Sequence, residues 1–184
     1  MSKMYRILAI MLSVSAVFCF TGIIASADEF TIINGDFETE VTTSLPNWSI
    51  YGGSFGTEVS VTQGGNTGSG NCLKLVKGSA ALGAISAKTF DFSAGEIYGI
   101  SVWALNESSS GIYVKIELYD GPSISGSNKL GNTVTKTVGT SASWQKVDYQ
   151  FMAPQGCKMI AVYLCNYSET VGATVYFDNL TFGK

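Results

Sequence analysis

Histidine is absent from this sequence of 184 residues, and arginine is almost absent. The one arginine, Arg6, lies in an N-terminal segment that we expect to be removed. Catalysis that uses histidine as a general base, and metal sites built on histidine, are therefore excluded.

Charged residues are also scarce, at 14% of the chain, where globular proteins have about a quarter. After residue 27, nine lysines stand against fourteen Asp and Glu residues, a net charge of about −5. An acidic chain without arginine lacks the positive surface that binds nucleic acid, so we expect no nucleic-acid partner. Gly, Ser, Thr, Asn, Val and aromatic residues are abundant instead, which is typical of an extracellular β protein.

Residues 1–27 are predicted to be a secretory signal peptide. Lys3 and Arg6 provide a positive start, residues 7–24 carry no charge, and Ala25-Ser26-Ala27 matches the small-x-small cleavage pattern. Cleavage would leave residues 28–184 as one secreted, extracellular domain without membrane contact. The alternative is an uncleaved anchor, because about 18 apolar residues almost span a bilayer.

Three cysteines remain after cleavage, Cys72, Cys157 and Cys165. An odd number permits at most one internal disulfide, and three cysteines without histidine make a poor zinc site. We expect small buried residues within strands, and leave open whether two of them form a disulfide.

Apolar residues alternate with polar ones in short segments that are separated by Gly, Ser, Asn and Pro. The predicted strands are 30–33, 48–51, 58–62, 72–76, 84–92, 98–105, 113–119, 133–138, 144–152, 158–166 and 174–182. The segments 63–70 and 121–131 are predicted to be loops. So many short strands predict an all-β fold, a two-sheet antiparallel β-sandwich of the jelly-roll type.

The alternation also assigns each strand residue to the core face or to the opposite face. Aromatic and polar residues share the opposite face, and those that we consider further are Trp103, Tyr113, Lys115, Glu117, Gln150 and Tyr163. Such a surface suits a sugar, because a pyranose has an apolar face that stacks on a ring and hydroxyl groups that need polar partners. The alternative is that the rings are cross-strand pairs that stabilise the sheet. Trp48 and Trp144 are expected in the core.

Acidic motifs stand near both ends of the chain, Asn34-Gly35-Asp36-Phe37-Glu38 and Asp178-Asn179. The first and last strands of a sandwich commonly lie side by side, which would bring Asp36 or Glu38 close to Asp178. Carboxylate and carbonyl oxygens suit Ca²⁺. The alternative is that these are turn residues and one solvated aspartate.

Several motifs, in this order, resemble the carbohydrate-binding modules of families 4, 9 and 22, which have a galactose-binding-domain-like fold. These motifs are Asn34–Glu38, Pro46–Gly53, Gly68–Leu75, Gly95–Ala104, Ser143–Lys146, Ala153–Pro154 and Tyr176–Asn179. The resemblance implies a β-jelly roll that binds β-glucan or xylan chains in a groove and is usually attached to a glycoside hydrolase.

The resemblance also implies roles for particular residues. A structural Ca²⁺ would be held by Glu38 and Asp178, with carbonyl groups from the Asp36 region and the Gly70–Asn71 turn. Tyr51 occupies a position where such modules place a stacking ring, and strands 113–119 and 159–163 would lie in the groove. The groove of the family often contains an arginine, for which Lys115 is the nearest candidate here.

We therefore predict a secreted, noncatalytic protein that binds a polysaccharide or oligosaccharide. Sugar rings would stack on Tyr51, Trp103, Tyr113 and Tyr163, and Lys115, Glu117 and Gln150 would contact hydroxyl groups. The partners considered are a glycoside hydrolase and a component of the cell envelope. The polysaccharide and the oligomeric state stay open.

Two alternatives belong to other functional classes. A structural or adhesive protein of the envelope could have the same fold and no sugar site. A glycosidase needs two carboxylates about 5–10 Å apart, and Glu117 with Asp148 is the pair considered. Their neighbours Lys115 and Lys146 explain both acids equally well as members of ion pairs, so we do not expect an enzyme.

Overall fold

The computed structural model describes residues 29–30, 32, 34–39, 43–107 and 110–184. The predicted signal peptide, residues 1–27, lies outside the described residues. Within them, no helix is long and apolar enough to cross a membrane.

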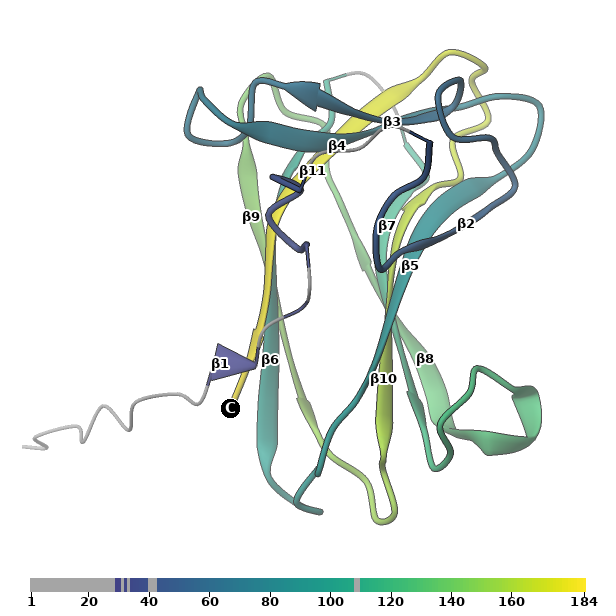
Figure 1. Ribbon diagram of the computed structural model, residues 1–184, viewed down its shortest axis with the longest axis vertical. Coiled ribbons are helices and arrows are strands. Elements are labelled where there is room, and N and C mark those ends of the chain that lie inside the picture. The colour runs from purple at the N-terminus through teal and green to yellow at the C-terminus, as the bar shows by residue number, and fades with distance from the viewer. Residues whose placement is uncertain (1–28, 31, 33, 40–42, 108–109) are drawn as a thin grey trace, which may run out of the picture.

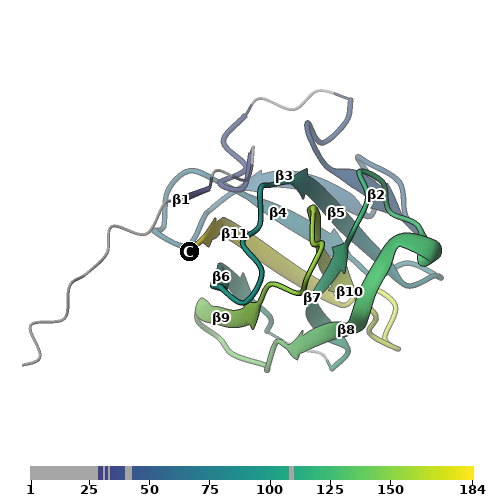
Figure 2. The ribbon, with the colours of Figure 1, turned by 90° about the horizontal axis from the view of Figure 1, so that it is seen from below.

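Two sheets face each other across a common core (Figures 1 and 2). Sheet A contains, in spatial order, β3 (Val59–Gln63), β4 (Asn71–Val76), β11 (Thr174–Gly183), β6 (Ile97–Leu105) and β9 (Gln145–Met152), and β1 (Glu29–Phe30) pairs with β11. Sheet B contains β2 (Ser49–Tyr51), β5 (Leu82–Thr89), β10 (Met159–Asn166), β7 (Ile112–Tyr119) and β8 (Lys129–Thr137). Every pairing between these strands is antiparallel, so the predicted fold, an all-β two-sheet sandwich, is confirmed.

The strand predictions fail mainly at the ends of two strands of sheet B. β5 ends at Thr89 rather than at residue 92, and β8 begins at Lys129, inside the segment predicted to be a loop. A bulge accounts for the second difference, since Ile116 pairs with Val134 while Leu118 pairs with Leu130. Gly131 lies within the bulge at a positive φ of 67°, a conformation that glycine adopts without strain. The residues between the paired positions therefore belong to a bulged strand.

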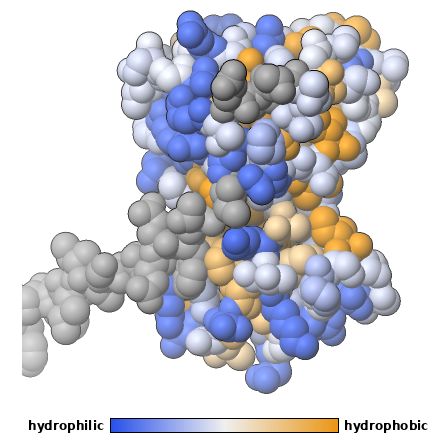
Figure 3. Space-filling view, viewed as in Figure 1, coloured by the Kyte–Doolittle hydropathy of each residue, from blue (hydrophilic) through white to orange (hydrophobic). Residues whose placement is uncertain are grey.

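The inward faces of the two sheets form the core. Val102 of β6, Val114 of β7 and Phe177 of β11 are all buried in it, as the alternation predicted for the first two. Figure 3 shows polar residues over the ends of the sandwich and apolar residues near its waist. Trp48 is buried as expected, but Trp144 is partly exposed. Trp144 precedes the first residue of β9, so the expectation that it lies in the core is wrong.

The central strand of sheet B, β10, is buried on both of its faces. A second apolar cluster covers the outer face of the sheet and contains Tyr119, Met159, Ala161, Tyr163 and Cys165. The three described cysteines are buried free thiols. Cys72 and Cys165 lie within strands as predicted, whereas Cys157 lies between β9 and β10. The outer face of sheet B is therefore more apolar and more closely packed than an exposed sheet surface.

The core assignment predicts the effect of removing a large ring. Phe177→Ala should lower the free energy of unfolding by about 3–5 kcal/mol, because the fully buried ring leaves a cavity. Ile124→Ala is the control: this side chain is 46% exposed, and its removal should cost less than about 0.5 kcal/mol. Urea titrations measure both, and equal losses would contradict the core described above.

Candidate functional site

The outer face of sheet B brings together side chains that lie far apart in the sequence. β7 and β10 pair without a break, with Tyr113 opposite Cys165, Lys115 opposite Tyr163 and Tyr119 opposite Met159. Residues that face each other in an antiparallel pair lie on the same side of the sheet. Every second residue of β7 therefore contributes to the same surface as the outward residues of β10.

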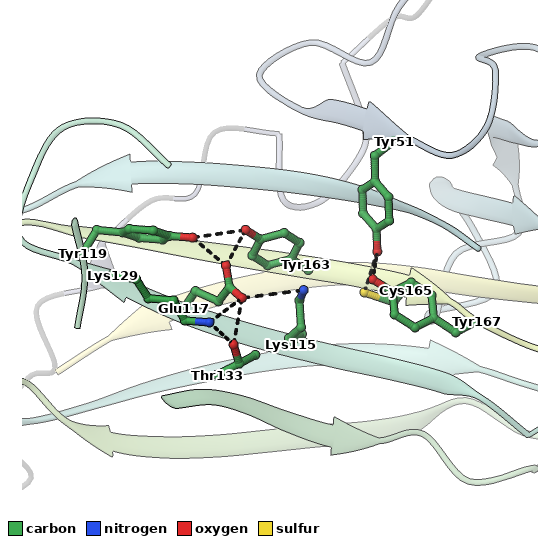
Figure 4. A network of polar contacts seen from close by, with 9 residues as sticks. All are labelled: Tyr51, Lys115, Glu117, Tyr119, Lys129, Thr133, Tyr163, Cys165 and Tyr167. Carbon is green, nitrogen blue, oxygen red and sulfur yellow. Dashed lines mark hydrogen bonds and ion pairs between the residues drawn. The ribbon is translucent and has the colours of Figure 1, made fainter. Parts of the chain in front are cut away.

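A carboxylate lies at the centre of a polar network on this surface (Figure 4). Glu117 Oε2 accepts hydrogen bonds from the hydroxyl groups of Tyr119 at 2.5 Å and Tyr163 at 2.6 Å. Its Oε1 accepts from Lys129 Nζ at 2.9 Å and from Thr133 Oγ1 at 2.8 Å. The bulge in β8 places Thr133 within reach of β7.

The network keeps Glu117 ionised. Burial alone would raise the pKa of this carboxyl group, but the hydrogen bonds from Tyr119, Tyr163, Lys129 and Thr133 lower it to about 2. An ionised carboxylate offers about four acceptor positions, and four donors occupy them here. While the network is intact, Glu117 has no position left for a sugar hydroxyl group, in contrast to the predicted direct contact.

Lys115 lies beside this network and covers one of its rings. Its Nζ atom is 4.0 Å from the centroid of the Tyr163 ring and 3.7 Å from Glu117 Oε1. Tyr163 is only 6% exposed, and burial raises the pKa of its hydroxyl group. The expectation that the Tyr163 ring is open to solvent is therefore wrong, because the side chain of Lys115 lies over it.

Other tyrosine rings continue the surface toward β2. The Tyr51 hydroxyl group donates toward Cys165 Sγ at 3.1 Å and lies 2.5 Å from the Tyr167 hydroxyl group (Figure 4). Tyr167 also meets Tyr113 edge-on, with the ring centroids 6.0 Å apart. Burial raises the pKa values of Tyr51 and Tyr167. The rings of Tyr51, Tyr113 and Tyr167 are each partly exposed, and we call these three residues the tyrosine surface.

Two of the predicted sugar-binding residues lie elsewhere. Trp103 of β6 and Gln150 of β9 are on the outer face of sheet A, with Asp148 of β9. Gln150 lines an open cavity of about 830 Å³ there. The expectation of one groove holding all seven residues is therefore wrong. Alternation assigns a residue to a face of its strand but does not say which sheet the strand joins.

The separation of the sheets also bears on the glycosidase alternative. Glu117 lies in sheet B and Asp148 in sheet A, so the core separates the two acids. Asp148 pairs with Lys146 at 3.2 Å, as expected for an ion pair on the surface. These two residues do not form a catalytic pair across one cleft.

Sequence reasoning missed four partners in the site. Tyr119 is on the outward face that the alternation gave for 113–119, so its position was predictable although its contact with Glu117 was not. Lys129 and Thr133 reach Glu117 because β8 contains a bulge, which no sequence pattern predicted. Tyr167 follows the last residue of β10 and carried no strand signal.

The acidic residues predicted to bind Ca²⁺ lie around the loop between β3 and β4. Glu38 Oε1 accepts a hydrogen bond from Asn71 N at 2.7 Å, and Glu38 Oε2 accepts from Asn71 Nδ2 at 3.2 Å. Gly70 has a positive φ, and a side chain there would collide with the Glu38 carboxylate. Asp36 is exposed, and its Oδ1 accepts from Glu38 N at 3.3 Å.

Asp178 holds the other side of the same loop. Its Oδ2 accepts from Asn66 N at 2.8 Å and its Oδ1 from Asn179 N at 2.7 Å. The side chain is buried, and burial, together with the charges of Glu38 and Asp36, raises the pKa of this carboxyl group.

The oxygen atoms around this loop are suitable ligands for a hard cation. They are carboxylate, amide and carbonyl oxygens, the ligands that Ca²⁺ prefers. Among the described residues, no three His, Cys, Asp or Glu side chains come close enough to hold a metal by themselves. Backbone or amide oxygens would therefore have to complete the set. Glu38, Gly70 and Asn71 line a cavity of about 630 Å³ in which such a set could form.

One family model, described as a carbohydrate binding domain, matches residues 31–167 of this chain. No curated protein sequence matches this chain.

Solved structures share the fold at low sequence identity. The enzymatically active domain of tailspike protein 4 from bacteriophage CBA120 superposes on 82% of this chain, with a TM-score of 0.62 and 16% identity, and this chain covers 20% of it. The CBM22-1–GH10 modules of Clostridium thermocellum xylanase 10B, complexed with xylohexaose, superpose with a TM-score of 0.54 and 17% identity. The match covers 75% of this chain and 26% of that one. The CBM22-1 xylan-binding domain of Paenibacillus barcinonensis Xyn10C superposes with a TM-score of 0.52 and 20% identity. The match covers 81% of this chain and 90% of that domain.

The low pKa of Glu117 predicts how the network depends on pH. A carboxyl group whose pKa is 4.5 when unperturbed and about 2 in the fold contributes stability above pH 4.5, and this is lost as the pH falls toward 2. The stability difference between the wild type and Glu117→Gln should therefore shrink by about 3 kcal/mol between pH 6 and pH 2.

Urea unfolding across this range measures the difference. Asp148→Asn is the matched control, because that carboxylate is largely exposed, and its difference from the wild type should change little. A constant gap for Glu117→Gln would mean that the carboxylate gains nothing from its four donors.

Proposed function

This chain belongs to the carbohydrate binding domain family, and we propose that it is a secreted, noncatalytic protein whose tyrosine surface on sheet B binds a polysaccharide chain. The observation that supports this site is the row of partly exposed rings, Tyr51, Tyr167 and Tyr113, held edge-on to one another. Exposed rings beside polar side chains match the apolar face and hydroxyl rim of a pyranose.

The three rings are held in place by contacts with one another. The hydroxyl groups of Tyr51 and Tyr167 hydrogen-bond to each other, and the ring of Tyr167 contacts both Tyr51 and Tyr113. A side chain that is already ordered loses little conformational entropy on binding. Lys115, at the centre of the same face, would supply N–H donors to the sugar, whereas Glu117 would position its neighbours.

The first ligand to test is a β-1,4-linked xylan. Two of the similar structures are named as a xylan-binding domain and as xylanase modules complexed with xylohexaose. Mixed-linkage β-glucan, hydroxyethylcellulose, mannan and galactan are the comparison polymers. If the envelope alternative holds, none of these polymers will be bound, although the sandwich is intact.

We also propose that Ca²⁺ stabilises the fold. Glu38 and Asp178 would hold the ion, with oxygens from Asp36, Gly70 and Asn71 completing the set. Two carboxylates on opposite sides of one loop support this assignment, and among the described residues neither of them accepts a hydrogen bond from a lysine. The ion would tie the segment before β2 to β4 and β11 and would play no part in contacting the sugar.

The sugar site predicts which rings matter in affinity gel electrophoresis. Tyr113→Ala and Tyr167→Ala should each weaken binding to the polymer that retards the wild type. The expected loss is about tenfold, equal to about 1.4 kcal/mol of lost stacking. Tyr176→Ala is the matched control, a partly exposed tyrosine in sheet A, and should bind as the wild type does.

Trp103→Ala tests the other face of the sandwich. If it abolishes retardation while Tyr113→Ala does not, the sugar site is on sheet A and the proposed site is wrong. If the wild type is not retarded by any polymer, the proposed function itself fails.

The calcium site predicts a change in thermal unfolding. At a Ca²⁺ concentration of about 100 times its dissociation constant, the ion should add about 2.7 kcal/mol, which corresponds to a rise in Tm of about 5–10 °C for a domain of this size. Glu38→Gln and Asp178→Asn should abolish the rise, and Asp91→Asn, an exposed acid, should keep it. Equal melting temperatures in Ca²⁺ and in EDTA would overturn the proposed calcium site.

A further inference from the structure

The outer face of sheet B carries an excess of positive charge. Of the described side chains that the strands place on this face, three are charged: Lys115, Lys129 and Glu117. Lys88 and Lys136 pair with Ile160 and Val114, whose side chains are in the core, so they lie on the other side. The face therefore has two ammonium groups for one carboxylate, in a protein whose net charge is −3.

The single carboxylate is shared unequally. Lys129 Nζ donates to Glu117 Oε1 at 2.9 Å, whereas Lys115 Nζ is 3.7 Å from the same atom. Within the part of the chain that the structure describes, Lys115 Nζ donates no hydrogen bond, and it lies over the ring of Tyr163. An ammonium group has three donors, so those of Lys115 are available to a ligand.

The surroundings of Lys115 strengthen its electrostatic interaction with an anionic ligand. Its side chain is only 21% exposed and lies over the ring of Tyr163, so the local dielectric constant is below that of water. A charge-assisted hydrogen bond is about twice as strong as a neutral one. A neutral hydroxyl group would fill a donor of Lys115, but only an anion would also neutralise the surplus charge.

Glu117 does not oppose an anion at this place. Both of its oxygens are occupied by donors from Tyr119, Tyr163, Lys129 and Thr133, and Lys129 balances its charge. The two charged residues just beyond the strands, Asp120 and Lys158, are exposed and have opposite signs. The surplus is therefore located at Lys115.

We propose that the tyrosine surface takes an acidic polysaccharide, with an anionic group of the sugar bound by Lys115. This inference rests on the proposed function and specifies its substrate class. A uronate carboxylate and a sulfate ester share the required chemistry.

The test compares two forms of one polymer. Glucuronoxylan and the same glucuronoxylan with its carboxyl groups reduced to alcohols differ only in charge. The wild type should bind the acidic form at least tenfold more tightly in affinity electrophoresis and calorimetry. The preference should weaken as NaCl rises from 20 to 200 mM, because salt screens the attraction. Polygalacturonate and dextran sulfate, as further arms, distinguish carboxylate from sulfate recognition, and preferential binding of either supports the proposal.

Variants test whether Lys115 is responsible. Lys115→Gln keeps N–H donors and removes the charge, so its affinities for the acidic and the reduced polymer should become equal. Lys136→Gln removes an exposed lysine from the other side of sheet B and should keep the preference. Thermal unfolding confirms that both variants fold. Lys115→Arg retains the charge and should therefore keep the preference for the acidic polymer that Lys115→Gln loses.

The outcomes separate the two proposals. Equal affinity of the wild type for acidic and reduced xylan, with no binding of the other anionic polymers, overturns the acidic substrate and leaves polysaccharide binding intact. A preference that survives in Lys115→Gln overturns the role of Lys115. Absence of binding to every polymer, neutral or acidic, overturns the proposed function as well.

Discussion

The carboxylate of Glu117 is the interaction on which the functional face of sheet B depends. It is partly buried on the outer face of sheet B and accepts hydrogen bonds from Tyr119, Tyr163, Lys129 and Thr133. A buried charge without partners would cost several kcal/mol, whereas this one orders three strands at once. The phenol groups that it binds are fixed in turn, and burial together with the hydrogen bond to Glu117 raises the pKa of Tyr119 to about 12. The outer face of sheet B is therefore preorganised by Glu117, whose acceptor positions are all occupied.

This arrangement requires that β10 be buried on both faces. One side of the strand contributes Ile160 and Val162 to the main core, and the other contributes Met159 and Tyr163 to the second cluster. The partly buried side chains that pack against the second cluster are three tyrosines, Tyr51, Tyr113 and Tyr167, and one isoleucine, Ile85. A sheet surface of this kind can present aromatic rings without exposing a large apolar patch, which would favour aggregation. The tyrosine hydroxyl groups give the surface its polar partners.

The sequence predicted the sandwich well because its evidence was local. Alternation places Val102 and Val114 in the core and Tyr113 and Lys115 on the opposite face, and the structure agrees. Two kinds of information were not local. Which sheet a strand joins depends on long-range pairing, so Trp103 was grouped with Tyr163 although their strands lie in different sheets. Two partners of Glu117, Lys129 and Thr133, depend on a bulge in β8. The resemblance to known carbohydrate-binding modules, although confirmed, did not include this bulge.

The proposed calcium and sugar sites lie on different sheets, and this separation limits how they can influence each other. Asp178 belongs to β11 of sheet A, while Lys115 and Glu117 belong to β7 of sheet B. A direct polar link between the sheets is Asn166 of β10, whose Nδ2 donates to the carbonyl groups of Leu75 at 3.1 Å and Ala173 at 2.9 Å. Since Asn166 ends the strand that carries Tyr163, an ion at the sheet A loop would stabilise the scaffold of the sugar face through the packed core. Its effect on sugar affinity would then follow the fraction of folded protein, with no change in the contacts themselves.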